Sequence, residues 1–127
     1  MIPISEHVDE LRYILQNLMA ESDEIQGLSI VSVQGLPIVS LMDSSVNDGI
    51  VSAMAAAIQS VGERAAEELS RGKLRRIMLD GETGQMIMNQ AGEHAILVTL
   101  VKQDSSLGVI FMLIESFSRK IAKILDA

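Results

Sequence analysis

The amino-acid sequence predicts an α+β fold in which helices cover an antiparallel sheet. Helical patterns stand at both ends and in the middle of the chain, and five short strand-like runs lie between them, giving the order α-β-β-α-β-β-β-α. The turns between neighbouring strands are too short for the crossover that a parallel pair requires. A sheet with buried strands needs cover on both faces. We therefore expect the long middle helix on one face and the two terminal helices on the other.

Length and composition limit the class of protein. The chain has 127 residues, which predicts a single domain over residues 1–127. Its net charge of −7 and its three aromatic residues argue against nucleic-acid binding, because such surfaces are basic and stack bases on aromatic rings. No cysteine is present for thiol chemistry. The longest apolar runs are far shorter than a membrane span of roughly 20 residues, and no signal peptide is evident. We expect a cytoplasmic protein without membrane insertion.

The first helix and the hairpin after it have clear patterns. The helix is expected to start at Ser5, and its apolar residues recur at helical spacing: Val8, Leu11, Ile14, Leu15, Leu18 and Met19. Two strands at 28–33 and 36–42 follow, joined by a tight turn at Gln34-Gly35, and together they predict a β-hairpin. Proline lacks a backbone N–H donor, so Pro37 predicts that the second strand lies at an edge.

The longest helical pattern runs from Ser45 to about Arg71. Ser45 and Asp48 have the spacing of an N-terminal capping box, with Asp in place of Glu. One apolar stripe is expected to face the sheet: Ile50, Val51, Met54, Ile58, Val61, Ala65 and Leu69. A flank of small residues lies beside it, consisting of Ala53, Ala56, Ala57 and Ser60, followed by Arg64. Those alanines either reflect helix propensity alone or allow a second subunit to approach closely.

The C-terminal half predicts three more strands and a last helix. The strands are expected at 73–79, 85–90 and 94–101. The third is apolar without alternation, which predicts a central strand buried on both faces. Residues 109–114 are compatible with a strand, but the period of the residues after them favours a helix. Its apolar stripe is Leu107, Ile110, Phe111, Ile114, Phe117, Ile121 and Leu125.

Residues for catalysis or for binding a cofactor do not form a recognisable arrangement. Two isolated histidines without any cysteine cannot build an ordinary zinc site. Asp80 and Glu82 lie in a short turn without the spacing of a calcium loop. Lys73 is followed by Leu74 rather than by the Ser or Thr of a phosphate-binding loop. We therefore expect a non-enzymatic protein with no catalytic, cofactor-binding or metal-binding residues.

A basic cluster precedes and opens the third predicted strand. Arg71, Lys73, Arg75 and Arg76 place four of the ten basic residues of this acidic chain within six positions. One interpretation is that charge protects an edge strand from pairing with other chains. The other is an electrostatic contact with an acidic partner.

Several short segments carry a family resemblance. They are GLSIVS at 27–32, QGLPI at 34–38, the Ala-rich 54–58, GEHAILV at 92–98 and the Leu-Gly pair at 107–108. Over nearly its whole length the chain resembles the Roadblock/dynein light-chain family, especially its small bacterial and archaeal members. The hairpin turn departs from the family pattern, because Gln34 stands where Asp or Asn is common.

The resemblance implies a sheet order of 2-1-5-4-3 and dimers formed through the long helix and the third strand. It also implies partnership with small Ras-like GTPases. A homodimer of this type accelerates GTP hydrolysis in a bacterial polarity system, and related eukaryotic domains scaffold GTPases or bind a dynein chain. The dimer interface is then expected to include Ala53, Ala56, Ala57, Ser60, Arg64, Lys73, Arg75 and Ile77.

The leading hypothesis is a homodimer that binds and regulates a small Ras-like GTPase, with stimulation of GTP hydrolysis as one form of regulation. Partner contacts are expected on the polar side of the long helix, at Ser52, Gln59, Glu63 and Glu67. A solvated helix face would have the same composition. Arg64 is the first candidate for an arginine finger. Two alternatives stay open: a structural adaptor of the light-chain type with no effect on hydrolysis, and a small-molecule sensor with an apolar pocket.

Overall fold

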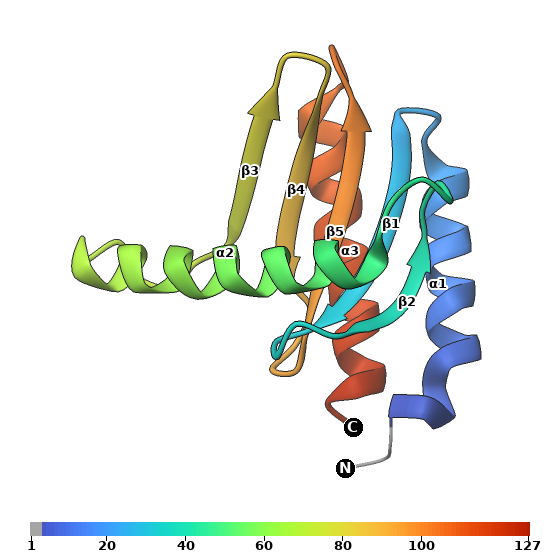
Figure 1. The fold of residues 1–127 in the computed structure, drawn as a ribbon, viewed down its shortest axis with the longest axis horizontal. Helices are drawn as coiled ribbons and strands as arrows, with labels where there is room; N and C mark the ends of the chain where they lie inside the picture. Colours follow the sequence, from blue (N-terminus) through green and yellow to red (C-terminus); the bar gives the residue numbers. More distant parts are fainter. Residues whose placement is uncertain (1–3) are drawn as a thin grey trace.

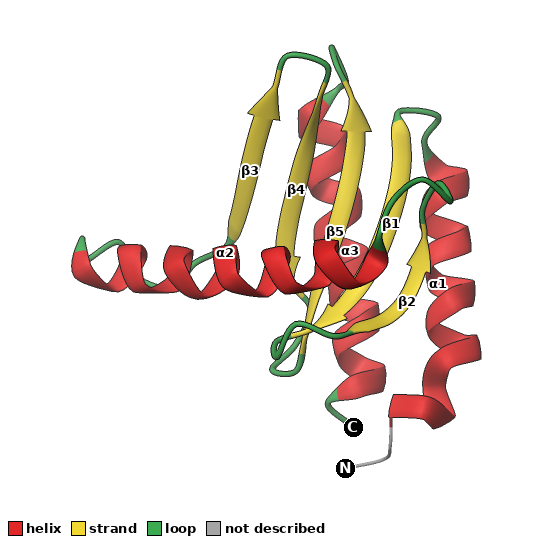
Figure 2. Cartoon of the chain, in the orientation of Figure 1, coloured by secondary structure: helices red, strands yellow, loops and turns green. Residues whose placement is uncertain are grey.

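The computed structural model describes residues 4–127 and consists of three α-helices, one short 3-10 helix and a five-stranded sheet (Figures 1 and 2). All neighbouring strands are antiparallel. No helix in this part of the chain has the length and apolar character needed to cross a membrane. In chain order the elements are η1 (Ile4–His7), α1 (Val8–Glu21), β1 (Ile25–Ser32), β2 (Pro37–Leu41), α2 (Asp48–Glu68), β3 (Arg76–Gly81), β4 (Gly84–Gln90), β5 (Ala95–Lys102) and α3 (Leu107–Leu125).

The strand order is β2-β1-β5-β4-β3, as the family resemblance implies. Three positional predictions from the sequence are confirmed: β5 lies in the centre, and β2 and β3 lie at the edges. Seven of the eight residues of β5 are buried or half-buried, because helices cover both of its faces. Gly35 closes the β1–β2 turn with a φ of 98°, a left-handed conformation that glycine adopts without steric cost.

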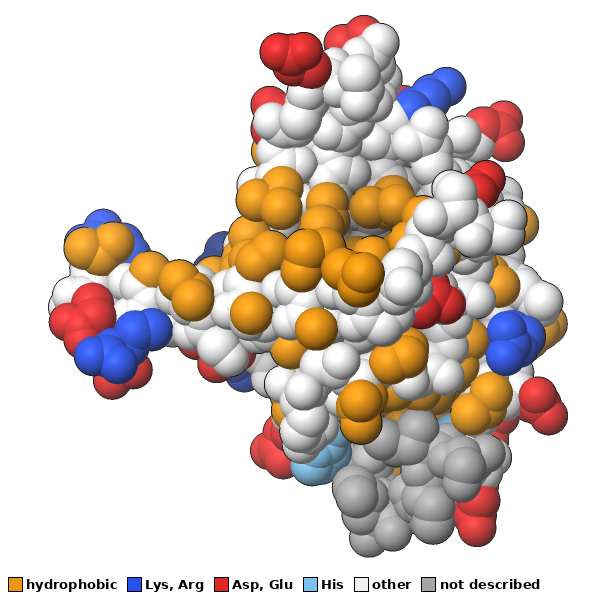
Figure 3. All heavy atoms as spheres, viewed as in Figure 1, with side chains coloured by type: hydrophobic (Ala, Val, Ile, Leu, Met, Phe, Trp, Pro, Cys, Tyr) orange, Lys and Arg blue, Asp and Glu red, His pale blue; other side chains and the backbone are white. Residues whose placement is uncertain are grey.

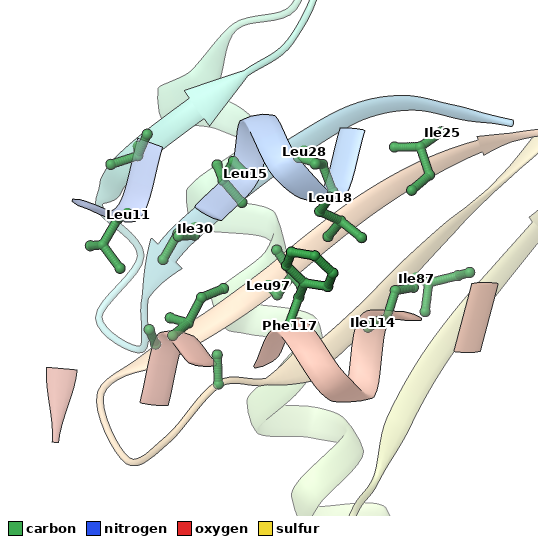
Figure 4. Packing of buried hydrophobic residues seen from close by; sticks show 14 of the residues in the cluster. Leu11, Leu15, Leu18, Ile25, Leu28, Ile30, Ile87, Leu97, Ile114 and Phe117 are labelled. Atoms are coloured by element: carbon green, nitrogen blue, oxygen red, sulfur yellow. The ribbon is translucent and has the colours of Figure 1, made fainter. Parts of the chain in front are cut away.

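The larger core lies between the sheet and the two terminal helices. Figure 4 shows Leu18 of α1, Leu97 of β5 and Phe117 of α3 converging in this layer. All three side chains are 5% exposed or less. The predicted inward faces of α1 and α3 are confirmed, because their stripes supply Leu11, Leu15, Ile110, Ile114, Ile121 and Leu125 to the same core.

The helix α2 crosses the other face of the sheet (Figure 1). Its buried residues are Ser52, Ala55, Ala56 and Gln59, and Ala55 packs against the sheet residues Met88, Ile96 and Val98. The prediction that the apolar stripe faces inward was therefore wrong for most of its members. Ile50, Met54, Val61 and Leu69 are 50–69% exposed, whereas Ile58 is partly buried against the smaller core.

The reason for this reversal is the size of the side chains on the sheet. The sheet face under α2 already carries methionine and β-branched aliphatic residues, so small side chains on the helix let the two elements approach closely. Gly62 shows how close the approach is, because a Cβ atom added there would lie 2.6 Å from the Cδ1 of Ile77 on β3. Helical periodicity identifies an apolar stripe but does not say which neighbour it contacts.

The start of α2 also differs from the prediction. The helix begins at Asp48, and Asn47 is its N-cap, with the side-chain oxygen accepting a hydrogen bond of 3.0 Å from the backbone N–H of Ile50. The predicted capping box at Ser45 is therefore wrong. Ser45 lies in the preceding turn, where its backbone N–H donates to the Asp43 carboxylate at 2.9 Å and holds the pKa of Asp43 below its ordinary value.

The central strand generates a stability prediction. Leu97 is fully buried in the larger core, so replacing it with alanine removes apolar contacts and leaves a cavity. We expect Leu97→Ala to lower the free energy of unfolding by about 2–5 kcal/mol in urea denaturation. Leu36 is the matched control, because its side chain is 66% exposed in the β1–β2 turn. Leu36→Ala should change stability by no more than about 0.5 kcal/mol, and equal losses in the two variants would contradict this core.

Candidate protein interaction surface

Hydrophobic side chains of α2 and of the sheet beside it form one exposed surface (Figure 3). The helix crosses only part of the sheet, and its C-terminal end extends beyond β3 (Figure 1). Opposite residues of neighbouring strands share one face, so Leu79 of β3, Met86 of β4 and Leu100 of β5 all lie on the α2 side. We call the helix–sheet patch the six residues Ile50, Met54, Val61, Leu79, Met86 and Leu100, all exposed or half-buried.

The helix–sheet patch differs from an ordinary protein surface. Single exposed apolar residues are common, whereas a contiguous group of large ones marks a protein or membrane contact, a ligand-binding groove or an aggregation-prone surface. Among residues 4–127 the same face holds no cluster of three or more His, Asp or Glu side chains able to bind a metal. The large exposed side chains of this face offer apolar contacts.

The residues expected at a dimer interface divide into two groups. Ala53, Ala57, Ser60 and Arg64 are exposed along α2 next to the patch, and Lys73 and Arg75 are exposed in the loop before β3. Ala56 is only 8% exposed and is buried within its own subunit, so the expectation that Ala56 is available to a second subunit was wrong. Ile77 is half-buried beneath Gly62 of α2.

The residues expected to contact a GTPase divide in the same way. Glu63 and Glu67 are exposed on α2. Ser52 and Gln59 are 0% and 4% exposed, so the expectation that they face solvent was wrong. The Ser52 hydroxyl donates to the Asp48 carbonyl at 2.7 Å, and the Gln59 amide donates to Glu63 Oε1 at 3.2 Å. Both residues lie on the same side of α2 as Ala55 and Ala56. The small size of those alanines was the sequence signal that this side of the helix packs against the sheet.

Charged groups on α2 make a weak local pair. The Arg64 guanidinium donates to Glu68 Oε1 at 3.0 Å, and both side chains are more than 60% exposed. Exposed pairs of this kind contribute little to stability, so Arg64 can leave Glu68 at small cost. Near the end of β3, Asp80 accepts a hydrogen bond of 2.8 Å from the side-chain amide of Gln85, its cross-strand partner on β4, which gives this carboxylate a structural role in the β-hairpin.

Comparison with known proteins identifies the family. Residues 11–101 match the family model described as the Roadblock/LC7 domain. This chain belongs to the Roadblock/LC7 family. Two uncharacterized proteins of Methanocaldococcus jannaschii are each 37% identical to this Roadblock/LC7 domain over 101 residues, which is 80% of this chain and 88% of each relative.

Solved structures show the same fold at low sequence identity. MglB of Myxococcus xanthus superimposes with a TM-score of 0.88 at 16% identity, over 99% of this chain and 93% of that one. A Roadblock/LC7 domain from Streptomyces avermitilis gives a TM-score of 0.83 at 15% identity, over 91% and 97% of the two chains. The gliding protein MglB from Thermus thermophilus gives 0.82 at 16% identity, over 94% and 90%.

The burial of Gln59 in this Roadblock/LC7 domain generates a second prediction. Its Oε1 atom is buried and has no hydrogen-bond partner among the described residues. A buried acceptor without a partner costs free energy. We expect Gln59→Leu to raise the free energy of unfolding by about 1 kcal/mol in chemical denaturation. The exposed Gln16 of α1 is the control, and Gln16→Leu should have almost no effect. A large loss of stability in Gln59→Leu would show that the amide oxygen is paired in solution.

Proposed function

We propose that this Roadblock/LC7 domain is a homodimeric, non-enzymatic partner of a small Ras-like GTPase and regulates its GTP hydrolysis. The observation that carries the proposal is the helix–sheet patch on a member of this family. Family membership supports the class of partner, because the family resemblance implies binding to Ras-like GTPases. The similarity in fold to MglB over almost the whole chain is consistent with the same class.

A second copy of the chain is the partner that we assign to the helix–sheet patch. The exposed side of α2 combines large residues, such as Val61, with the small Ala53 and Ala57, so two such helices can pack closely. The edge strand β3 has one side without a neighbouring strand within residues 4–127. Such an edge offers unpaired backbone N–H and C=O groups. Pairing of two β3 strands would join two sheets into one of ten strands, as the family resemblance implies.

We assign the GTPase contact to two exposed acidic residues of α2, Glu63 and Glu67. In a dimer each of these residues occurs twice around a two-fold axis. A regulator must bind one nucleotide state, or the transition state, more tightly than the other. Because the switch segments of a GTPase are ordered by the γ-phosphate, contact with these segments would supply that difference. Arg64 lies on the same helix and is the arginine to test for stabilisation of the transition state.

The dimer is tested by a charge placed on the exposed side of α2. We expect the unmodified protein to have a mass near twice 13.8 kDa by light scattering at micromolar concentration. Ala57→Glu should shift it toward the monomer, because it puts charge and bulk where a neighbour packs. Ala20→Glu on α1 is the matched control, since Ala20 is also exposed on a helix, and it should leave the mass unchanged. A monomeric unmodified protein would contradict the proposed dimer.

The GTPase contact is tested by charge reversal. The double variant Glu63→Lys, Glu67→Lys should bind the GTPase at least about tenfold more weakly and lose any stimulation of GTP hydrolysis, while its thermal stability changes little. The control is Asp9→Lys, Glu21→Lys on α1, which changes the net charge equally at exposed positions on the other side of the sheet. Unchanged binding by the α2 variant would place the contact elsewhere. Equal binding of GTP and GDP forms without any effect on hydrolysis would favour the structural adaptor.

A further inference from the structure

A basic pocket lies on the side of the sheet opposite the helix–sheet patch. Its volume is about 840 Å³, and its walls come from the loop between α2 and β3, from β3 and β4, from the β4–β5 turn, and from the C-terminal half of α3 with Asp126 after it. The volume falls within the roughly 300–1,000 Å³ of small-molecule sites. Five of the ten Lys and Arg residues of this acidic chain line it, namely Arg71, Lys73, Arg75, Arg76 and Arg119.

The five cationic side chains have no carboxylate partners in the part of the chain that the structure describes. The ion pairs found among residues 4–127 join His7 to Glu10 and Arg64 to Glu68. Arg76 instead lies over the ring of Phe111, with its guanidinium carbon 4.3 Å from the ring centroid. This stacking leaves the edge of the guanidinium group, where its N–H donors lie, available to a ligand. The pocket therefore concentrates positive charge that its own protein does not neutralise by direct pairing.

Two buried polar side chains in the lining also lack partners. Asn89 of β4 and Ser118 of α3 are each 6% exposed, and neither Asn89 Oδ1 nor Ser118 Oγ has a hydrogen-bond partner among the described residues. Buried polar atoms normally have hydrogen-bond partners, so two unpaired atoms in one pocket require an explanation. Both atoms have almost no accessible surface as they stand, so a ligand reaches them only when the side chains turn toward the pocket. A ligand with several acceptor oxygens then provides a partner, because a hydroxyl can donate and an amide can turn its NH₂ group toward the ligand.

Three carboxylates share the lining with the five cations, so the formal charge of the pocket stays positive. One of them, Asp126, already accepts hydrogen bonds of 3.2 and 3.3 Å from the backbone N–H of Glu93. The other two, Glu93 and Glu115, are exposed. Acceptors at the rim favour a ligand that carries hydroxyl or amine donors in addition to its anionic group.

We propose that this pocket binds the phosphate group of an organic phosphate, either a free phosphoester or a lipid headgroup. Four of the five cations are arginines, and the planar guanidinium matches phosphate oxygens with two parallel hydrogen bonds. A phosphate monoester carries more charge and more terminal oxygens than a single carboxylate, so it engages more donors from several segments at once. The helix–sheet patch lies on the other face of the sheet, but Lys73 and Arg75 are also expected at the dimer interface, so the proposal is tested through Arg119 and Ser118 of α3.

The test is titration calorimetry of the full chain with inorganic pyrophosphate. We expect measurable binding that weakens as salt concentration rises. Arg119→Gln should weaken it roughly 10- to 100-fold, the effect of losing hydrogen bonds to a charged group. Arg12→Gln is the matched control, because Arg12 is an exposed arginine on the other terminal helix, α1, and it should bind like the unmodified protein. Absence of pyrophosphate binding, or equal binding by the two variants, would overturn the proposal.

Ser118→Ala separates ligand binding from folding. The Ser118 hydroxyl makes no hydrogen bond within the described chain, so its removal should leave the melting temperature unchanged or higher. We expect pyrophosphate binding to fall several-fold, because one hydrogen bond to the anion is lost. Unchanged affinity in Ser118→Ala would overturn the role of the buried hydroxyl in this site.

Two further probes identify the source of the phosphate. Sedimentation with phosphatidylcholine vesicles that contain phosphatidic acid, weakened by Arg119→Gln, would support a lipid headgroup. Binding of pyrophosphate without binding of these vesicles would support a free phosphoester. A polyglutamate peptide is the competing ligand, since a basic surface also attracts acidic polypeptides. If that peptide bound more tightly than pyrophosphate and depended equally on Arg119, the pocket would be a protein contact and the phosphate proposal would be wrong.

Discussion

The close contact between α2 and the sheet determines how this domain presents its surfaces. The sheet supplies the bulky residues of the smaller core, and α2 packs on them through Ala55, with Ala56 and Ser52 buried on the same side of the helix. A helix that packs through small side chains can lie near the sheet. At Gly62, which has no side chain, α2 also lies close to Ile77 of β3. As a consequence, the large apolar residues of α2 remain exposed on the surface of the monomer. Their exposure is a consequence of the packing, and it leaves the apolar surface to which we assign a second copy of the chain.

Helices cover the two faces of the sheet to different degrees. On one face α1 and α3 together cover the strands and form the larger core around Phe117. On the other face α2 crosses the strands, and Leu79 remains 45% exposed beside it. This asymmetry separates stability from association. The face with two helices supplies the larger core, whereas the face with one helix retains exposed apolar area, which we propose that a second copy buries.

Charge is distributed as unevenly as apolar area. The chain carries a net charge of −7, yet half of its Lys and Arg residues line one pocket beside α3. The sequence brings four of them together, but Arg119 joins them only through the fold, because α3 packs against the same end of the sheet as Arg76. The loop before β3 also explains the clustering: β3 starts at Arg76, so Arg71, Lys73 and Arg75 lie outside the strand ladder and are free to line a pocket.

The sequence by itself determined the elements, the central and edge strands, and the inward faces of α1 and α3. These features depend on local signals: turn residues such as Gly35, the missing N–H donor of Pro37, and helical stripes that have only one possible neighbour. Only the tertiary structure decided which side of α2 faces inward. An exposed stripe and a buried stripe have the same period, and the size of the sheet residues under Ala55 decides between them. The pocket likewise depends on residues far apart in sequence, and no local pattern links Asn89 and Ser118 before the chain folds.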